Sequence, residues 1–331
     1  MANDGCAMPL PKAGVSVVIP SHNRPVLLQE ALSSVLEQTY PPSEIIVVDD
    51  ASTPPVCLPT SRNGVTLRLL RHEQAKGGAA AKSTGAQAAQ NELLAFLDDD
   101  DLWAPTYLER ATTLLTQHRN IDVLFMGVDW FGKNAQVSRP AYLQAMDKVL
   151  AEADGKPLAP GMLGFGPQLV QALLQRVPMA FQRPVVRRVA FQRIGDYLKH
   201  CLLWDCDWAL RAALDGKVAL SEAPLYRQRV DSQGYSSQPT REIEQTLSNI
   251  EIRERLANIL TAKDATTQAL RRNFKQSAGQ NWFHLAYQLQ LQGQTREALK
   301  AWLTSQWLVS QPGSIKLLAR ILLNQPNRSK S

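Results

Sequence analysis

The chain has 331 residues, 44% hydrophobic and 20% charged, with a formal net charge of +6 at pH 7. This length and apolar content suit one α/β domain of roughly 200–250 residues with an appendage, and they exclude global disorder, a collagen-like repeat and a disulfide scaffold. No run approaches the ~18 apolar residues of a transmembrane helix, and the first residues lack a secretory signal pattern. Four cysteines suit a reducing cytoplasm. The mild positive excess favours anionic substrates or an acidic membrane face, but it is too diffuse to indicate nucleic-acid binding.

Strand and helix patterns alternate through the first hundred residues. Short β-branched runs predict strands, and apolar residues recurring on one face predict helices. The predicted strands are 15–20, 44–48, 65–70, 93–97 and 218–220, and the predicted helices are 25–38, 77–90 and 205–215. Apolar strands separated by helices are typical of a mostly parallel sheet that is buried on both faces. The fold class is therefore α/β.

Two other regions have a different character. Glycine and proline are frequent between about residues 130 and 180, and no element is assigned there. Beyond about residue 240 only helical patterns occur, and the pair near 282–289 and 298–303 resembles one tetratricopeptide-like hairpin. We expect these helices to form an appendage that packs on the α/β domain or on a partner.

Polar residues follow three of the predicted strands. These clusters are Ser21-His22-Asn23, Asp49-Asp50 and Asp98 to Asp101. In open α/β sheets, ligands gather outside the carboxyl ends of the strands. The shared position of the three clusters therefore predicts a binding site at this edge.

The run from Asp98 to Asp101 places four carboxylates side by side, where they repel one another unless a counter-charge is near. Oxygen ligands suit Mg²⁺ or Mn²⁺. Alternation along an extended segment puts Asp98 and Asp100 on the same side. The alternatives are a solvated acidic turn and capping of the next helix by Asp101. The place of the run at a strand end favours the metal site.

Two other segments carry weaker signals. Asp49 and Asp50 could bind a nucleotide base or ribose, but a turn that ends the strand is the better reading in isolation. The segment around Lys82 resembles a phosphate-binding loop but lacks glycine at positions 76 and 81. We therefore read it as a glycine-opened helix, on which Lys82 could be an ordinary surface lysine.

A pair of acids lies between two tryptophans. Partial desolvation of Asp205 and Asp207 would raise a carboxyl pKa toward the range of a general base. The alternative is that Asp205 caps a helix and Asp207 pairs with Arg211 four residues later. The nearby cysteines and histidine lack the spacing of a zinc site.

Three segments, taken together and in order, resemble a family 2 glycosyltransferase with the GT-A fold. They are VSVVIPSHNRPVLLQEALSSVLEQTYPPSEIIVVDDAST, GGAAAKSTGAQAAQNELLAFLDDDDLWAPTYL and WDCDWALRAALDGKVALSEAPLYRQR. The resemblance extends over about residues 14–237. It implies inverting transfer of a sugar from a nucleotide-sugar donor, with Mn²⁺ or Mg²⁺ as cofactor. We accordingly expect an N-terminal extension at 1–13, a GT-A domain at 14–239 and a helical C-terminal region at 240–331.

The resemblance also implies roles for individual residues. Asp205 matches the catalytic base, while Asp100 and Asp98 match the metal-binding D-x-D motif. The residues expected at the donor are Pro20, His22, Asn23, Asp49, Asp50, Lys82, Asp98, Asp99 and Arg229.

Four positions depart from the family pattern. Lys82 and Ser83 stand where the family has arginine and asparagine, and Trp204 replaces a glutamate. Asp231 stands where many members have histidine.

The leading hypothesis is a cytoplasmic enzyme, or one peripheral to the inner face of the cell membrane, that builds a bacterial surface polysaccharide. Its expected partners are a nucleotide-sugar donor, preferably a UDP-sugar, and a glycan or lipid-linked glycan acceptor, without nucleic acid. The C-terminal helices would serve a homo-oligomer or a protein partner. One alternative is a nucleotide-sugar-binding protein without catalysis, whose helical tail is an interaction module. Another is a nucleotidyltransferase, which also uses strand-end carboxylates and a metal.

Overall fold

The computed structural model of the protein describes residues 13–58, 61–62, 64–231, 238–261 and 264–323. The extension predicted at 1–13 therefore lies almost entirely outside the described residues. Within the described ranges, no helix has both the length and the hydrophobicity to cross a bilayer.

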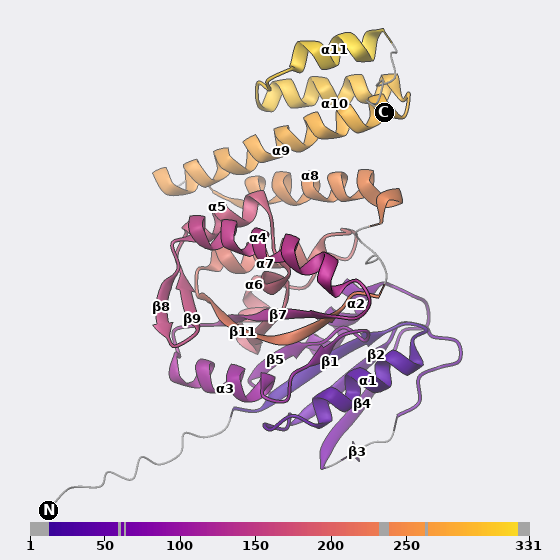
Figure 1. Cartoon of the computed structure of the whole chain (residues 1–331), viewed down its shortest axis with the longest axis vertical. Helices are drawn as coiled ribbons and strands as arrows, with labels where there is room; N and C mark the ends of the chain where they lie inside the picture. The colour runs from indigo at the N-terminus through magenta and orange to yellow at the C-terminus, as the bar shows by residue number, and fades with distance from the viewer. Residues whose placement is uncertain (1–12, 59–60, 63, 232–237, 262–263, 324–331) are drawn as a thin grey trace, which may run out of the picture.

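One mixed sheet of eleven strands organises the described part of the chain (Figure 1). The strands are β1 (Val15–Ser21), β2 (Glu44–Asp49), β3 (Ser61–Arg62), β4 (Val65–Arg71), β5 (Leu93–Phe96), β6 (Leu102–Trp103), β7 (Val123–Phe131), β8 (Lys156–Ala159), β9 (Met162–Phe165), β10 (Pro184–Arg187) and β11 (Val218–Arg229). Their order is β3-β4-β2-β1-β5-β10-β7-β11-β9-β8, and β6 pairs with β11.

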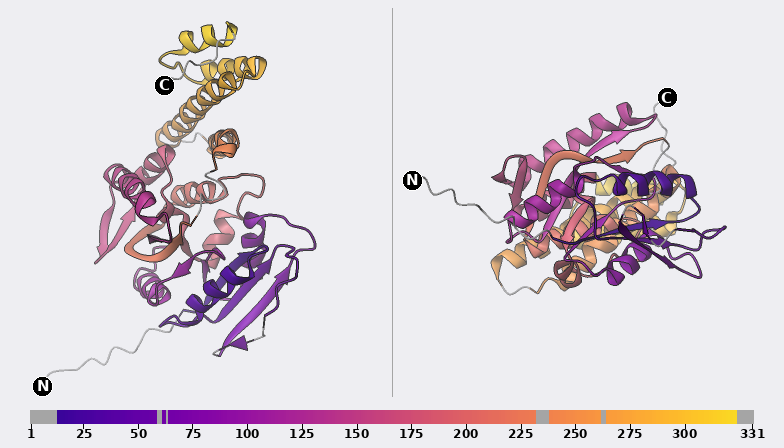
Figure 2. Two further views of the ribbon diagram at one scale, coloured as in Figure 1. Left: turned by 45° about the vertical axis from the view of Figure 1, so that its right-hand side comes forward. Right: turned by 90° about the horizontal axis from the view of Figure 1, so that it is seen from below.

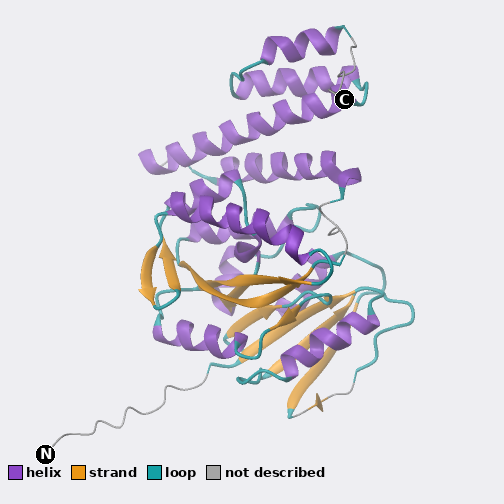
Figure 3. Ribbon diagram, in the orientation of Figure 1, coloured by secondary structure: helices purple, strands orange, loops and turns teal. Residues whose placement is uncertain are grey.

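Helices flank the sheet and continue beyond it, where the described residues from 238 onward form helices without strands (Figure 3). They are α1 (Pro25–Leu36), α2 (Gly78–Ala88), α3 (Tyr107–Gln117), α4 (Ala135–Ala153), α5 (Gln168–Gln175), η1 (Met179–Gln182), α6 (Arg188–Ile194), α7 (Trp204–Asp215), η3 (Pro239–Arg241), α8 (Glu242–Ile259), α9 (Ala265–Leu291), α10 (Thr295–Leu308) and α11 (Ser314–Leu322).

All elements predicted in the first hundred residues form, with ends within two residues of the expected positions, and the structure adds the two-residue strand β3. Strands β4, β2, β1 and β5 pair in parallel. Val17 and Ile46 are fully buried, as expected for strands that are covered on both faces. Pro25 opens α1, where its missing N–H costs no hydrogen bond.

Beyond β5 the sheet differs from the mostly parallel one that the sequence predicts. Strand β10 runs antiparallel to both β5 and β7, and β9 runs antiparallel to β11. The strand predicted at 218–220 is the start of the much longer β11, whose pairing with β7 is irregular between Ser221 and Tyr226. Pro224 lies within this irregularity. A proline lacks the N–H that a regular ladder needs, which explains why the sequence pattern breaks there.

The region without assigned elements contains two helices and two strands, α4, β8, β9 and α5. Helix α4 is 19 residues long and includes Pro140 near its start. The proline interrupts the helical pattern in the sequence, and four later positions are buried.

The C-terminal helices extend away from the sheet (Figures 1 and 2). Helix α9 enters two hydrophobic clusters, because Phe274 lies in the main core and Leu285 and Leu289 lie in a second one. The second cluster also takes side chains from α10 and α11, including Ala298 and Ile321. The predicted hairpin is thus formed by α9 and α10.

Candidate active site

Parallel pairing of β2, β1 and β5 brings the ends of three strands to one edge of the sheet. Ser21 and Asp49 are register partners at the ends of β1 and β2. The hydroxyl of Ser21 donates a hydrogen bond to Asp99 Oδ2 at 2.8 Å, and His22 Nδ1 lies 2.6 Å from the carbonyl oxygen of Asp50. The three polar clusters are therefore linked by direct contacts.

Two cations hold the carboxylate of Asp98. Lys82 Nζ lies 2.6 Å from Oδ1, and Arg183 Nη2 lies 3.4 Å from Oδ2. Only 3% of the Lys82 side chain and 6% of the Arg183 side chain are exposed. Burial would raise the pKa of Asp98, but the charges of Lys82 and Arg183 outweigh it and lower the pKa to about 2.

Arg24 bridges the next two acids of the run. Its Nη1 donates to Asp99 Oδ1 at 3.0 Å and to Asp100 Oδ2 at 2.7 Å. Burial raises the pKa of Asp99 to about 6, against the opposing hydrogen bond from Ser21 and the charge of Arg24. The Asp100 side chain is 38% exposed, and among the described residues only Arg24 bonds to its carboxylate. Asp100 is therefore the acid of the run that is most open to a ligand.

Asp101 faces β11. Its Oδ2 accepts a hydrogen bond from the Tyr226 hydroxyl at 2.9 Å, and its Oδ1 accepts one from the backbone N–H of Arg229 at 2.8 Å. Arg183 Nη2 lies 3.7 Å from Asp101 Oδ2. Burial raises the pKa of Asp101 to about 7, although the charge of Arg183 opposes the shift. Asp101 ties the acidic run to β11 and does not cap α3, which starts at Tyr107.

Arg229, expected near the donor, lies beside the same run. Its Nε donates to the carbonyl oxygen of Asp100 at 2.8 Å, and its guanidinium pairs with Glu30. Asp231, at the position of the family's histidine, lies 3.6 Å from Arg229 Nη1. The end of β11 therefore adds a cation to the group around the acids.

Asp205 lies in the first turn of α7, among these charges. Its Oδ1 accepts a hydrogen bond from the N–H of Cys206 at 2.9 Å. Burial raises the pKa of Asp205, while the charges of Arg183 and Lys82 lower it in part. A carboxyl with a raised pKa is suited to taking up a proton near neutral pH.

The Trp204 ring packs directly on the side chain of Lys82. Lys82 Nζ lies 4.7 Å from the centre of the Trp204 ring, and the ring of Tyr197 lies edge-on at 4.9 Å. Cation–π contacts of this kind are favourable. The lysine and the tryptophan, two of the positions expected to depart from the family pattern, are therefore in direct contact.

Asp207, two residues after Asp205, is structural. It is fully buried and pairs with Arg211 at 2.9 Å, as its spacing predicts, and with Arg255.

Asp49 makes the contacts of a turn that ends strand β2, which was the alternative to a nucleotide-binding role. It accepts hydrogen bonds from the backbone N–H groups of Ser52 at 2.8 Å and Val56 at 3.1 Å, and it pairs with Arg71. Burial opposes ionisation, but these bonds prevail and lower the pKa of Asp49.

Asp50 anchors the segment that leads into α2. Its carboxylate accepts hydrogen bonds from the N–H groups of Lys76 at 2.8 Å and Gly77 at 2.7 Å. His72 Nδ1 lies 2.7 Å from Asp50 Oδ1. Burial opposes ionisation, but these partners prevail and lower the pKa of Asp50.

Pro20 and Asn23 belong to the first strand end. Pro20 is the register partner of Val48 in β1 and β2. The N–H of Asn23 donates to Ser52 Oγ at 3.0 Å, and Asn23 Oδ1 accepts from the N–H of Thr53 at 2.7 Å. The loops after β1 and β2 are thereby fastened together.

Sequence reasoning misses the partners that give the site its charge balance. Arg24 and Tyr226 lie within the segments that resemble the family but have no role assigned there, and His72 and Arg183 lie outside those segments. The only local signal for Arg183 is that it is the one charged residue among residues 177–186, most of which are apolar.

Asp100 fits a divalent cation better than Asp98 does. Among the described residues, no three His, Cys, Asp or Glu side chains gather as a protein-only metal site would need. Mg²⁺ often takes only one or two carboxylates together with substrate phosphates. Asp100 is exposed and has a carboxylate oxygen free for this role, whereas Lys82 and Arg183 already hold Asp98.

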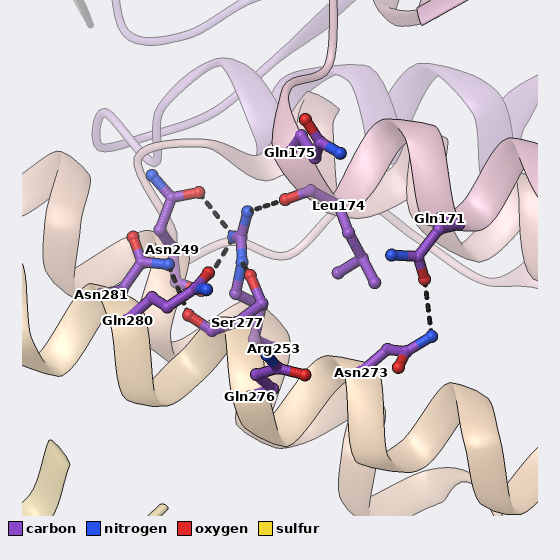
Figure 4. Close-up of a pocket in the computed structure, with 10 residues that line it drawn as sticks. All are labelled: Gln171, Leu174, Gln175, Asn249, Arg253, Asn273, Gln276, Ser277, Gln280 and Asn281. Carbon is purple, nitrogen blue, oxygen red and sulfur yellow. Dashed lines mark hydrogen bonds between the residues drawn. The ribbon is translucent and has the colours of Figure 1, made fainter. Parts of the chain in front are cut away.

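A polar pocket of about 540 Å³ lies elsewhere, between α5, α8 and α9 (Figure 4). It is lined by Gln171, Leu174, Gln175, Asn249, Arg253, Asn273, Gln276, Ser277, Gln280 and Asn281. The Arg253 guanidinium donates to the Leu174 carbonyl oxygen at 2.7 Å and to Ser277 Oγ at 2.7 Å. Arg253 therefore ties three helices together, and the pocket contains none of the predicted site residues.

Comparison with known sequences finds a family model that is similar to part of the chain. Residues 16–160 match the model of glycosyl transferase family 2. The Escherichia coli protein WfgD, a UDP-Glc:alpha-D-GlcNAc-diphosphoundecaprenol beta-1,3-glucosyltransferase, is 32% identical over 126 residues, which is 38% of this chain and 49% of WfgD. TuaG of Bacillus subtilis, a putative teichuronic acid biosynthesis glycosyltransferase, is 33% identical over 99 residues, or 29% of this chain and 39% of TuaG. The aligned segments span half or less of these relatives, and the family resemblance is confirmed for residues 16–160.

Solved structures confirm the fold over nearly the whole chain. The structure of S. aureus TarS 1–349 with UDP-GlcNAc superposes with a TM-score of 0.65 at 16% identity, covering 94% of this chain and 89% of that one. The mannosyltransferase PcManGT of Pyrobaculum calidifontis, in complex with GDP-Man and Mn²⁺, gives a TM-score of 0.52 at 17% identity, covering 95% of this chain and 81% of that one. The fold is the GT-A-like α/β fold with a C-terminal helical region.

Proposed function

We propose that this chain is an inverting glycosyltransferase that moves a sugar from a nucleotide-sugar donor, a UDP-sugar in particular, to a hydroxyl of a glycan or lipid-linked glycan. The observation that carries the proposal is the position of Lys82, whose Nζ lies 2.6 Å from Asp98 Oδ1 and 4.7 Å from the centre of the Trp204 ring, next to Asp205 in the chain. This arrangement joins the predicted base to the predicted diphosphate site. The donors in the TarS and PcManGT complexes are nucleotide sugars, which supports the substrate class.

In this proposal Asp205 accepts the proton of the acceptor hydroxyl as its oxygen attacks the anomeric carbon. The new carbon–oxygen bond forms on the face opposite the leaving diphosphate, whose bond to the sugar breaks. Lys82, Arg24 and Arg229 lie at the acidic run and supply positive charge near the departing diphosphate. A divalent cation bound at Asp100 would add charge stabilisation at the diphosphate.

The biological setting extends the same proposal. WfgD is named for a diphosphoundecaprenol-linked acceptor and TuaG for teichuronic acid biosynthesis, which favours a role in bacterial surface polysaccharide synthesis, in the cytoplasm or at the inner face of the membrane.

The test is Asp205→Asn, which keeps the size of the side chain and removes the base. We expect turnover with a UDP-sugar, Mn²⁺ and an acceptor to fall by about 10²–10⁴-fold. Donor affinity, measured by calorimetry, should stay within twofold of the wild type. Asp215→Asn, in the last turn of the same helix, is the matched control and should keep full turnover. Normal turnover of Asp205→Asn would contradict the assignment of the base.

A second candidate is a nucleotide-sugar-binding protein without catalysis. The replacement of the family's glutamate by Trp204 and its packing on Lys82 favour this reading. Donor binding without either transfer or hydrolysis, across a panel of nucleotide sugars and acceptors, would support it over the enzyme.

A further inference from the structure

The outer helices of the tail, α10 and α11, expose an unusual set of large apolar side chains. Trp307 is 84% exposed and Ile315 is 83% exposed. Leu323, Leu322 and Leu303 follow at 65%, 64% and 55%. Five of the 14 exposed large apolar side chains in the described part of the chain therefore fall within residues 303–323. Scattered apolar residues need no explanation, but a concentration of this kind marks an interaction surface.

Helical spacing places these side chains in stripes. On α10, positions 296, 300, 303 and 307 follow one face, so Arg296 and Lys300 continue into Leu303 and Trp307. On α11, Ile315 and Leu322 lie seven residues apart on one face, with Lys316 beside them. The opposite faces of both helices are occupied, since they supply Ala298, Ala301, Leu317 and Ile321 to the second hydrophobic cluster. The exposed stripes therefore have no partner within the described chain.

The net charge of this region is positive. Residues 296–331 contain six of the 36 lysines and arginines but only one of the 30 acids, so they carry +5 of the chain's net +6. In α10 and α11, Arg296, Lys300, Lys316 and Arg320 form no ion pair with any described residue. The rest of the chain is almost neutral. Within this region, the described residues 296–323 carry a net +3 from four lysines and arginines and one acid, on the same two helices that expose the apolar side chains.

We infer that α10 and α11 dock on a bilayer surface that is rich in anionic phospholipid. A mixture of basic and large apolar side chains on one helix surface is what such an interface selects, and tryptophan is favoured at the boundary between headgroups and acyl chains. Each Lys or Arg near an anionic surface strengthens attachment by about fivefold. The surface lies at the end of the molecule farthest from β3 and β4 (Figure 1). This inference stands independently of sugar transfer.

Vesicle co-sedimentation of the full chain tests the inference. We expect the chain to bind vesicles of phosphatidylglycerol and phosphatidylcholine at low salt, to bind pure phosphatidylcholine at least tenfold more weakly, and to be released by 0.5 M salt. Trp307→Ser with Ile315→Ser should weaken binding at least tenfold, and so should Lys316→Gln with Arg320→Gln.

Matched substitutions on α4 are the controls. Val137→Ser removes an apolar side chain that is 80% exposed, and Lys148→Gln removes an exposed charge. Both should bind vesicles like the wild type, and donor affinity should be unchanged in every variant, which shows that each is folded.

Three results would overturn the inference. The first is wild-type protein that stays in the supernatant with anionic vesicles. The second is tail variants that bind these vesicles as the wild type does. The third is a dimer, seen by light scattering, that Trp307→Ser with Ile315→Ser dissociates while vesicle binding is absent, because a second copy of the chain would then cover this surface. None of these results depends on transfer activity.

Discussion

Arg183 is the residue whose replacement tests the electrostatic account of the site most directly. Its side chain is 6% exposed and lies between Asp98 at 3.4 Å and Asp101 at 3.7 Å. Its guanidinium carbon also lies 4.7 Å from the centre of the Tyr226 ring. Arg183→Met keeps much of the volume and removes the charge. The variant therefore isolates what the buried cation contributes.

The expected cost follows from the partners that would remain. Asp98 keeps Lys82 at 2.6 Å, so the uncompensated charge falls mainly on Asp101, which is 3% exposed. Removing one partner of a buried ion pair typically destabilises a protein by about 3–5 kcal/mol. We expect a loss in this range at pH 8, where the Asp101 carboxyl is ionised.

The loss should shrink as the pH falls. The pKa of Asp101, raised by burial to about 7, exceeds its ordinary value of 3.8, so its contribution to stability is fully present below pH 3.8 and is lost as the pH rises through about 7. Without Arg183 this pKa rises further, and the decline in stability extends to higher pH. At pH 5.5 the Asp101 carboxyl is protonated in both the wild type and Arg183→Met. The loss of the Arg183 charge should therefore lower the free energy of unfolding by less than it does at pH 8. The same change should raise the pKa of Asp205 and move the ascending limb of the pH–rate profile to higher pH.

Urea unfolding followed by tryptophan fluorescence, at pH 5.5 and pH 8, measures the effect. Adding Asp101→Asn to Arg183→Met should recover part of the loss at pH 8, because it removes the stranded charge. Arg139→Met breaks an exposed pair with Asp129 and should cost no more than about 1 kcal/mol. An equal loss at both pH values, with no recovery in the double variant, would refute the reasoning.

Three further predictions address the donor site and the packing beneath it. Trp204→Glu introduces the residue expected from the family and adds a negative charge beside the acidic run. We therefore expect the Mn²⁺ concentration that gives half-maximal turnover to fall. An unchanged concentration would exclude a role for this position near the cation. Asp100→Ala should reduce donor affinity in Mn²⁺ to the value measured without metal, and calorimetry that shows wild-type affinity would remove Asp100 from the metal site. Gly85→Ala would place a Cβ atom 2.3 Å from Val18 Cγ1 and should lower the free energy of unfolding by about 1–3 kcal/mol. Gly78→Ala, whose Cβ would meet Trp204 at an ordinary 3.6 Å, is its control in urea unfolding and should be close to neutral.

The parallel half of the fold could be predicted because each strand there is short, apolar and bounded by turn residues. The local sequence pattern is enough to predict that Val17 and Ile46 are buried, as they are in the structure. The polar residues that follow each apolar run predict where its strand ends. The second half could not be predicted in the same way. Pro140 and Pro224 lie inside a helix and a strand whose tertiary contacts tolerate them, so a local reading stops at each proline.

The site residues also fall into a group that could be predicted from the sequence and a group that could not. The acids could be found because they are consecutive in the sequence, and Asp205 because it lies between tryptophans. Their cations come from separate elements, Arg24 from the residue before α1, Lys82 from α2 and Arg183 from the residue before β10, and only folding brings them together. The number of free carboxylates was therefore not predictable, since it depends on which cations reach which acid.

Helix α9 has a mechanical consequence. Its 27 residues span roughly 40 Å, and it is anchored at Phe274 in one core and at Leu285 and Leu289 in the other. Because α9 is one continuous helix packed into both hydrophobic clusters, it resists bending between them. Whatever binds the outer helices is therefore held at a fixed distance and angle from the α/β domain, and the tail acts as a spacer of fixed length.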